Sequence, residues 1–107
     1  MQIVMQVIAR AKDQDSLRQI IISDMRLDNF GLFVSEKQNP TRHDGWSKIH
    51  TQKSTNALNL SWEKETKTLT CRFITKGNAY PNEMIGDFVS YLIKHHKRKI
   101  KAILITP

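Results

Sequence analysis

Residues 57–75 of this 107-residue chain read ALNLSWEKETKTLTCRFIT, and they form its clearest structural pattern. Every second side chain in the two halves of this segment is apolar; these are Leu58, Leu60, Trp62, Leu69, Cys71 and Phe73. A period of two predicts β-strands with one buried face and one solvated face. The polar stretch 64–67 separates the halves as a turn would. The segment therefore predicts a β-hairpin in an antiparallel sheet that is half exposed to solvent.

A long amphipathic helix follows the hairpin, and it opens at Tyr80-Pro81-Asn82. Its apolar positions recur at helical spacing and are Ile85, Phe88, Val89, Leu92, Ile93 and His96. This stripe is typical of a helix that packs one side against a sheet. Gly86 lies inside the helix and away from the stripe, at a cost of about 1 kcal/mol relative to alanine, and close approach by another backbone would explain it. A final strand is predicted over 100–105.

The N-terminal part predicts a strand over 2–11, a helix that begins at about residue 17 and is closed by Asp28-Asn29, and a second strand over 30–35. In the helix, the inward side chains would be Leu17, Ile20, Ile21 and Met25, and the outward ones Arg18, Gln19 and Asp24. The β-branched run 20–22 leaves a strand as the competing prediction. The polar stretch 37–56 is long for a loop, so it either contains a short strand at 46–51 or carries a function.

These elements predict a single α+β domain over 1–107, in the order strand, helix, strand, strand, strand, helix, strand. A mostly antiparallel sheet of about five strands, with the two helices packed on one face, satisfies this order. The first and last strands are apolar on both faces, which favours positions near the middle of the sheet. The hairpin would then lie toward an edge.

This arrangement leaves several apolar side chains on the sheet face opposite the helices. They are Val4, Ile8, Ile74, Ile103 and Ile105. An exposed apolar face usually marks an interface, and sheet-to-sheet packing in a homodimer would cover this one. The alternative is that the 37–56 segment folds across the face within one chain.

Positive charge is concentrated at the C-terminal end. The chain has 17 Lys and Arg against 10 Asp and Glu, and its last twenty residues hold five cations and no carboxylate. A second basic stretch, in the polar loop, includes a tryptophan whose ring could stack on a base. We therefore expect DNA or RNA to be contacted by Arg42, Trp46, Lys48, Lys94, His95, Lys97, Arg98, Lys99 and Lys101.

Each of these features also has a structural explanation. Cations at the end of a helix complement its dipole, Trp46 could anchor the loop in the core, and His96 lies on the apolar stripe. The polar hairpin face (Asn59, Ser61, Thr70 and Arg72) lacks the aromatic rings of an RNA-binding sheet. The alternative function is a homodimeric interaction module that binds an acidic protein.

No catalytic motif is recognisable, so we lean toward a protein that is not an enzyme, with no cofactor and no metal. Cys71 with His43 or His50 is the nominal nucleophile–base pair, but the strand pattern turns Cys71 inward as an inert side chain. One cysteine and no membrane-spanning run predict a cytoplasmic protein without membrane contact, of bacterial or mobile-element origin.

Overall fold

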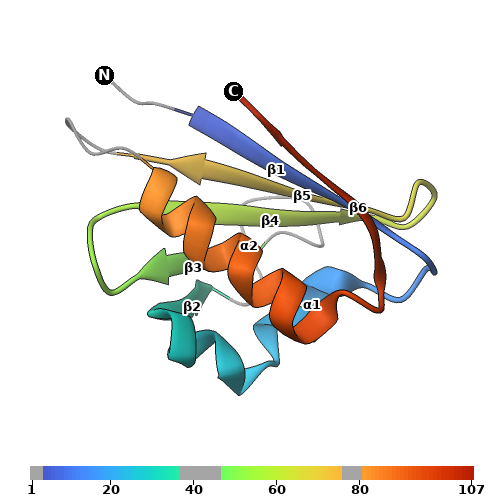
Figure 1. Cartoon of the computed structure of the whole chain (residues 1–107), viewed down its shortest axis with the longest axis horizontal. Coiled ribbons are helices and arrows are strands. Elements are labelled where there is room, and N and C mark those ends of the chain that lie inside the picture. The colour runs from blue at the N-terminus through green and yellow to red at the C-terminus, as the bar shows by residue number, and fades with distance from the viewer. Residues whose placement is uncertain (1–3, 37–46, 76–80) are drawn as a thin grey trace.

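The computed structural model describes residues 4–36, 47–75 and 81–107, in which a six-stranded antiparallel sheet carries its helices on one face (Figure 1). The elements are β1 (Val4–Ala11), α1 (Leu17–Ile22), the 3-10 helix η1 (Met25–Phe30), β2 (Leu32–Glu36), β3 (Ser47–Thr51), β4 (Ala57–Glu63), β5 (Thr68–Ile74), α2 (Asn82–His96) and β6 (Ile100–Thr106). The predicted α+β fold is confirmed. The undecided stretch 46–51 contains a strand, β3.

The hairpin prediction is also confirmed. Strands β4 and β5 pair antiparallel, with Leu58 opposite Phe73 and Leu60 opposite Cys71. All four side chains are fully buried on the helix-facing side of the sheet. Because opposite residues of an antiparallel pair share a face, the alternation in the sequence decides which side chains are buried together, and the turn length then sets the register.

The strand order differs from the prediction. The order is β2-β3-β4-β5-β1-β6, so the hairpin is central and β6 is an edge strand. Strand β3 adds beyond β4 and moves the hairpin inward. Strand β1 is indeed flanked on both sides, by β5 and β6. Strand β1 is therefore interior, as predicted, but it lies next to the edge and not near the middle of the sheet; for β6 the prediction is wrong.

The face assignment of β6 is a second correction. Ile103 lies opposite Ala9 and Ile105 opposite Val7, and both of these β1 residues are buried on the helix-facing side. Ile103 and Ile105 therefore do not belong to the opposite face. Leu104 does, together with Ile8 and Ile74 of the predicted group. The side chain of Val4 lies outside the described part of the structure.

The first helix is confirmed but is shorter than predicted. Ser16 caps it by accepting a hydrogen bond from the Gln19 N–H at 3.2 Å, and the helix ends at Ile22. Because the helical period stops there, Met25 is not inward, and its side chain is 91% exposed. Arg18 is not outward: it is buried and donates to Ser47 Oγ at 2.7 Å.

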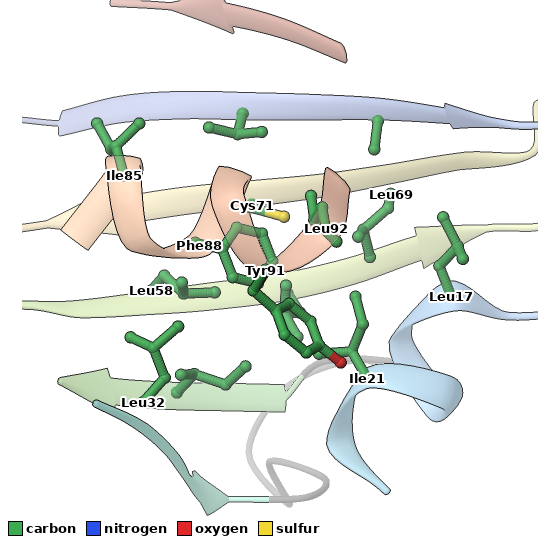
Figure 2. Close-up of a cluster of buried hydrophobic side chains, with 14 of the residues drawn as sticks. Leu17, Ile21, Leu32, Leu58, Leu69, Cys71, Ile85, Phe88, Tyr91 and Leu92 are labelled. Carbon is green, nitrogen blue, oxygen red and sulfur yellow. The ribbon is translucent and has the colours of Figure 1, made fainter. Parts of the chain in front are cut away.

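Helix α2 supplies most of the side chains that cover the sheet (Figure 2). Its buried residues are Met84, Ile85, Phe88, Tyr91, Leu92 and His96. The Phe88 ring meets the Phe73 ring edge-on at 5.9 Å between centroids. Ile93, predicted to be inward, is 50% exposed. Among the described residues, none outside the helix's own turn lies within 4 Å of a Cβ placed on Gly86, so no described backbone accounts for that glycine.

Candidate nucleic-acid interface

Four segments of the chain meet at one end of the sheet (Figure 1). They are the end of β1, the turn between β4 and β5, the end of α2 and the start of β6. Two backbone hydrogen bonds join them: the Lys12 N–H donates to the Lys99 carbonyl at 3.0 Å, and the Ala11 N–H donates to the Lys67 carbonyl at 2.8 Å. Cations from distant parts of the sequence are thereby brought together.

Cations flank the C-terminal end of α2 in the sequence. Lys94 lies in the last turn of the helix, and Lys97 and Arg98 follow directly after its last residue, His96. The chain then reverses into β6 through hydrogen bonds from the Lys99 N–H to the His96 carbonyl at 3.0 Å and from the Ile100 N–H to the Lys97 carbonyl at 3.3 Å. We call the resulting surface the basic end; its residues are Lys12, Lys67, Lys94, Lys97, Arg98, Lys99 and Lys101.

The cations of the basic end are open to solvent and carry uncompensated charge. Most are exposed, with Lys67 and Lys99 half-buried. None forms an ion pair with a carboxylate in the described part of the chain. Lys53 is the contrast, because its ammonium lies 3.0 Å from Asp87 and 3.4 Å from Glu83.

The basic end has an acidic margin. Carboxylates occur in the segment after β1 and around the β4–β5 turn, at Asp13, Asp15, Glu63 and Glu65. The Asp13 carboxylate accepts a hydrogen bond from the Asp15 N–H at 3.0 Å, so one of its oxygens is bound to the backbone of its own segment. An anionic ligand would therefore approach from the side of α2 and β6.

The structure does not gather every residue that the sequence suggested for this site. Lys48 lies in β3, on the sheet face opposite the helices and four strands from β6, which is about 19 Å across the sheet at about 4.8 Å per strand. His95 is half-buried, and its ring packs against Phe30 and Tyr91 at centroid distances of 5.9 and 5.7 Å. Arg42 and Trp46 lie outside the described residues.

Lys12 and Lys67 were missed by the sequence reasoning. Each flanks a strand, and such positions look like ordinary solvated lysines. They could have been found only by predicting that the N-terminal strand pairs antiparallel with the second strand of the hairpin. That pairing places Lys12, after the end of the first strand, close to Lys67, before the start of the second. Lys67 also has φ +54°, a left-handed conformation that non-glycine residues adopt mainly in turns.

A hydrogen-bonded network lies beneath the basic end, and it joins η1 to α2. The Tyr91 hydroxyl donates to Asp24 Oδ2 at 2.7 Å and lies 2.7 Å from His96 Nε2, which is itself 3.1 Å from Asp24 Oδ2. Arg26 donates to both Asp24 oxygens at 2.9 Å. His96 is buried, as its place on the apolar stripe predicted.

The protonation states of this network follow from its contacts. Hydrogen bonding from Arg26 holds the pKa of Asp24 far below its usual range, while burial and the neighbouring carboxylate raise the pKa of Tyr91. Burial lowers the pKa of His96 below 6.5 despite the nearby carboxylate. A neutral His96 protonated on Nε2 can donate to the Tyr91 oxygen, which in turn donates to Asp24. These groups satisfy one another, which is the behaviour of a structural network.

The nominal Cys71–histidine pair is not assembled among the described residues. Cys71 is 0% exposed on the helix-facing side, and burial raises the pKa of its thiol. His50 lies on the other face of the sheet, opposite Ala57 and stacked on Phe33. His43 lies outside the described residues. Burial makes Cys71 inert, as predicted.

Comparison with known proteins finds no matching family model, no matching curated protein and no matching solved structure. None of the described helices is long and apolar enough to cross a membrane. Functional inferences for this chain therefore depend on its own sequence and structure.

Proposed function

We propose that this chain is a non-enzymatic accessory protein that binds DNA or RNA by contacting phosphates with its basic end. The observation that carries the proposal is the convergence of cations from four segments onto one surface, without ion pairs to described carboxylates. Lysine and arginine on such a surface neutralise phosphates and release condensed counterions, which favours binding.

The chemistry of the basic end favours contact with the nucleic-acid backbone over reading of bases. None of its seven residues is aromatic, so it offers no ring on which a base could stack. Phosphate contacts position a ligand and carry no sequence information. We therefore expect weak sequence selectivity and binding that depends strongly on salt.

The first test is fluorescence anisotropy with labelled random-sequence DNA and RNA across a salt series. The expected result is an affinity that falls linearly on a double-logarithmic plot, with a slope set by the number of phosphates contacted. Absence of binding to both ligands at about 50 mM salt, where phosphate contacts are strong, would overturn the proposal.

A pair of charge-matched variants localises the contact. Lys97→Gln with Arg98→Gln removes two cations from the basic end, and we expect weaker binding and a salt slope lower by about 2. Lys48→Gln with Arg72→Gln removes the same charge from the opposite sheet face and should leave the slope unchanged. The reverse ranking of the two variants would place the ligand on that face instead.

A further inference from the structure

Strand β6 is an edge strand that exposes apolar side chains on both faces. Among the described strands it pairs only with β1 (Figure 1). Leu104 is 45% exposed on the outer face of the sheet, and Ile105 is 51% exposed on the helix-facing side. The backbone groups on its free side have no strand partner in the part of the chain that the structure describes. Such an edge is a template for pairing with another chain.

An open hollow of about 270 Å³ lies beside this edge, between α2 and β6. Its lining residues are Ile93, Lys97, Ile100, Lys101, Ala102 and Ile103. Ile93 belongs to the apolar stripe of α2, yet it is half exposed and borders this hollow. A further strand laid against β6 would cover Ile93 and direct side chains into the hollow.

Charge and apolar character are separated along β6. Lys99 directly precedes the strand and Lys101 is its second residue, whereas the stretch 102–106 carries no charged side chain. Lys101 also falls at a register shift in the pairing with β1, between Ile100 and Ala102. Irregularities and lysines of this kind limit the pairing of an edge, so the stretch available to a second strand is 102–106.

We propose that β6 pairs antiparallel with β6 of a second copy of this chain, with the two Leu104 side chains opposite each other. In this register Ile103 lies opposite Ile105 and Ala102 opposite Thr106, so every pair is uncharged. On the helix-facing side, Ile105 of each copy lies next to Ile103 of the other and enters the hollow beside Ile93. The helices of both copies then share one face of a continuous sheet.

The charge pattern favours a second copy over another partner. When the two β6 strands pair antiparallel about Leu104, their uncharged 102–106 stretches lie side by side. The lysines at the start of each strand then lie at opposite ends of the pair, so they do not repel one another. A register in which the two-fold axis passes between the two Ile103 residues would instead place Lys101 opposite Ile105. An acidic segment would find no charge to select it within 102–106. This inference does not depend on nucleic-acid binding.

Light scattering over a concentration series tests the association. The paired stretch is short, so we expect a weak dimer whose mass rises from one chain to twice that value between micromolar and near-millimolar concentrations. A constant monomeric mass over this range would overturn the proposal. Binding of an acidic extended peptide by such a monomer would overturn it too, and would assign the edge to a different protein.

Cysteine cross-linking tests the register. Leu104→Cys should form a disulfide-linked dimer on mild oxidation, because directly opposite residues bring their Cβ atoms close to the range that a disulfide spans. Ala102→Cys is the control on the same face; it lies opposite Thr106, so it should remain monomeric. Cys71 is buried and does not compete. Equal cross-linking of the two variants would exclude this register.

Leu104→Lys separates association from folding. The side chain is half exposed, so we expect native circular dichroism together with loss of the concentration-dependent mass. A folded Leu104→Lys variant that still dimerises would exclude the edge as the interface. If the variant does not fold, the cysteine pair still decides the matter.

Discussion

At the residue scale, the Asp24–Tyr91–His96 network explains how a polar group can sit in the core of so small a fold. A buried polar atom costs stability unless it has a hydrogen-bond partner. Here one carboxylate oxygen serves both the tyrosine and the histidine, and Arg26 holds that carboxylate from the solvent side. The network therefore connects η1 to the end of α2, directly beneath the basic end.

This network predicts a pH-dependent stability. The pKa of His96 is lowered in the folded protein by burial, so below the ordinary value of 6.5 the unfolded chain takes up the proton first. Stability from neutral His96 is fully present above pH 6.5 and is lost as the pH falls toward the folded pKa. The lowered pKa of Asp24 adds a separate loss only below its ordinary value of 3.8.

Urea unfolding at several pH values measures this effect. We expect wild type to lose stability as the pH falls through the range just below 6.5. His96→Gln should be less stable by about 1–3 kcal/mol at neutral pH, because it disturbs a buried hydrogen-bonded network, and should lack that pH-dependent loss. His95→Gln is the adjacent control and should retain it. A His96→Gln variant with the wild-type pH profile would refute the assignment.

Single residues were predictable from sequence where a local period determined them. Cys71 and His96 are buried because their strand and helix are regular. Met25 was assigned to the wrong side because α1 ends at Ile22, and no local pattern marked that end. The contact between Arg18 and Ser47 joins segments 29 residues apart, which periodicity cannot reveal.

At the element scale, α2 contains a correctable weakness in Gly86. A glycine in a helix interior costs about 0.5–1 kcal/mol relative to alanine, and a Cβ at this position would meet no atom of a neighbouring described element within 4 Å. We therefore expect Gly86→Ala to raise the free energy of unfolding by about 0.5–1 kcal/mol. Gly31→Ala is the matched control: φ there is +71°, so alanine should destabilise the protein. Thermal unfolding of both variants measures the difference, and a destabilised Gly86→Ala would contradict the open space at that site.

Elements were easier to predict than their order. The hairpin and α2 follow from periods of two and of about four residues, both of which are local properties. The position of β6 at an edge was not predictable in this way, because two apolar faces are compatible with a central strand and with an edge that awaits a partner. The same ambiguity led to Ile103 and Ile105 being placed on the wrong face.

For the molecule as a whole, the sequence predicted the C-terminal cations of the candidate site but not the cations that other segments add to it. The run 94–101 shows a cationic cluster in any reading of the sequence. Lys12 and Lys67 join it only through the pairing of β1 with β5 and with β6, which is a property of the tertiary fold. The separation of Lys48 from the cluster likewise depends on strand order. Local charge therefore indicated where the cations concentrate, and topology determined which further cations join them.

The net charge of +7 makes the two proposed associations respond to salt in opposite directions. Two copies of this chain repel each other, and salt screens that repulsion over a Debye length of about 10 Å at 0.1 M, while the apolar contacts between the β6 strands persist. Binding to phosphates loses affinity over the same range, because counterion release is less favourable in concentrated salt. We therefore expect light scattering to show tighter self-association at high salt, and anisotropy to show weaker nucleic-acid binding. Self-association that weakens with salt would mean that charge pairs hold the copies together, and the uncharged 102–106 stretch could not then be the interface.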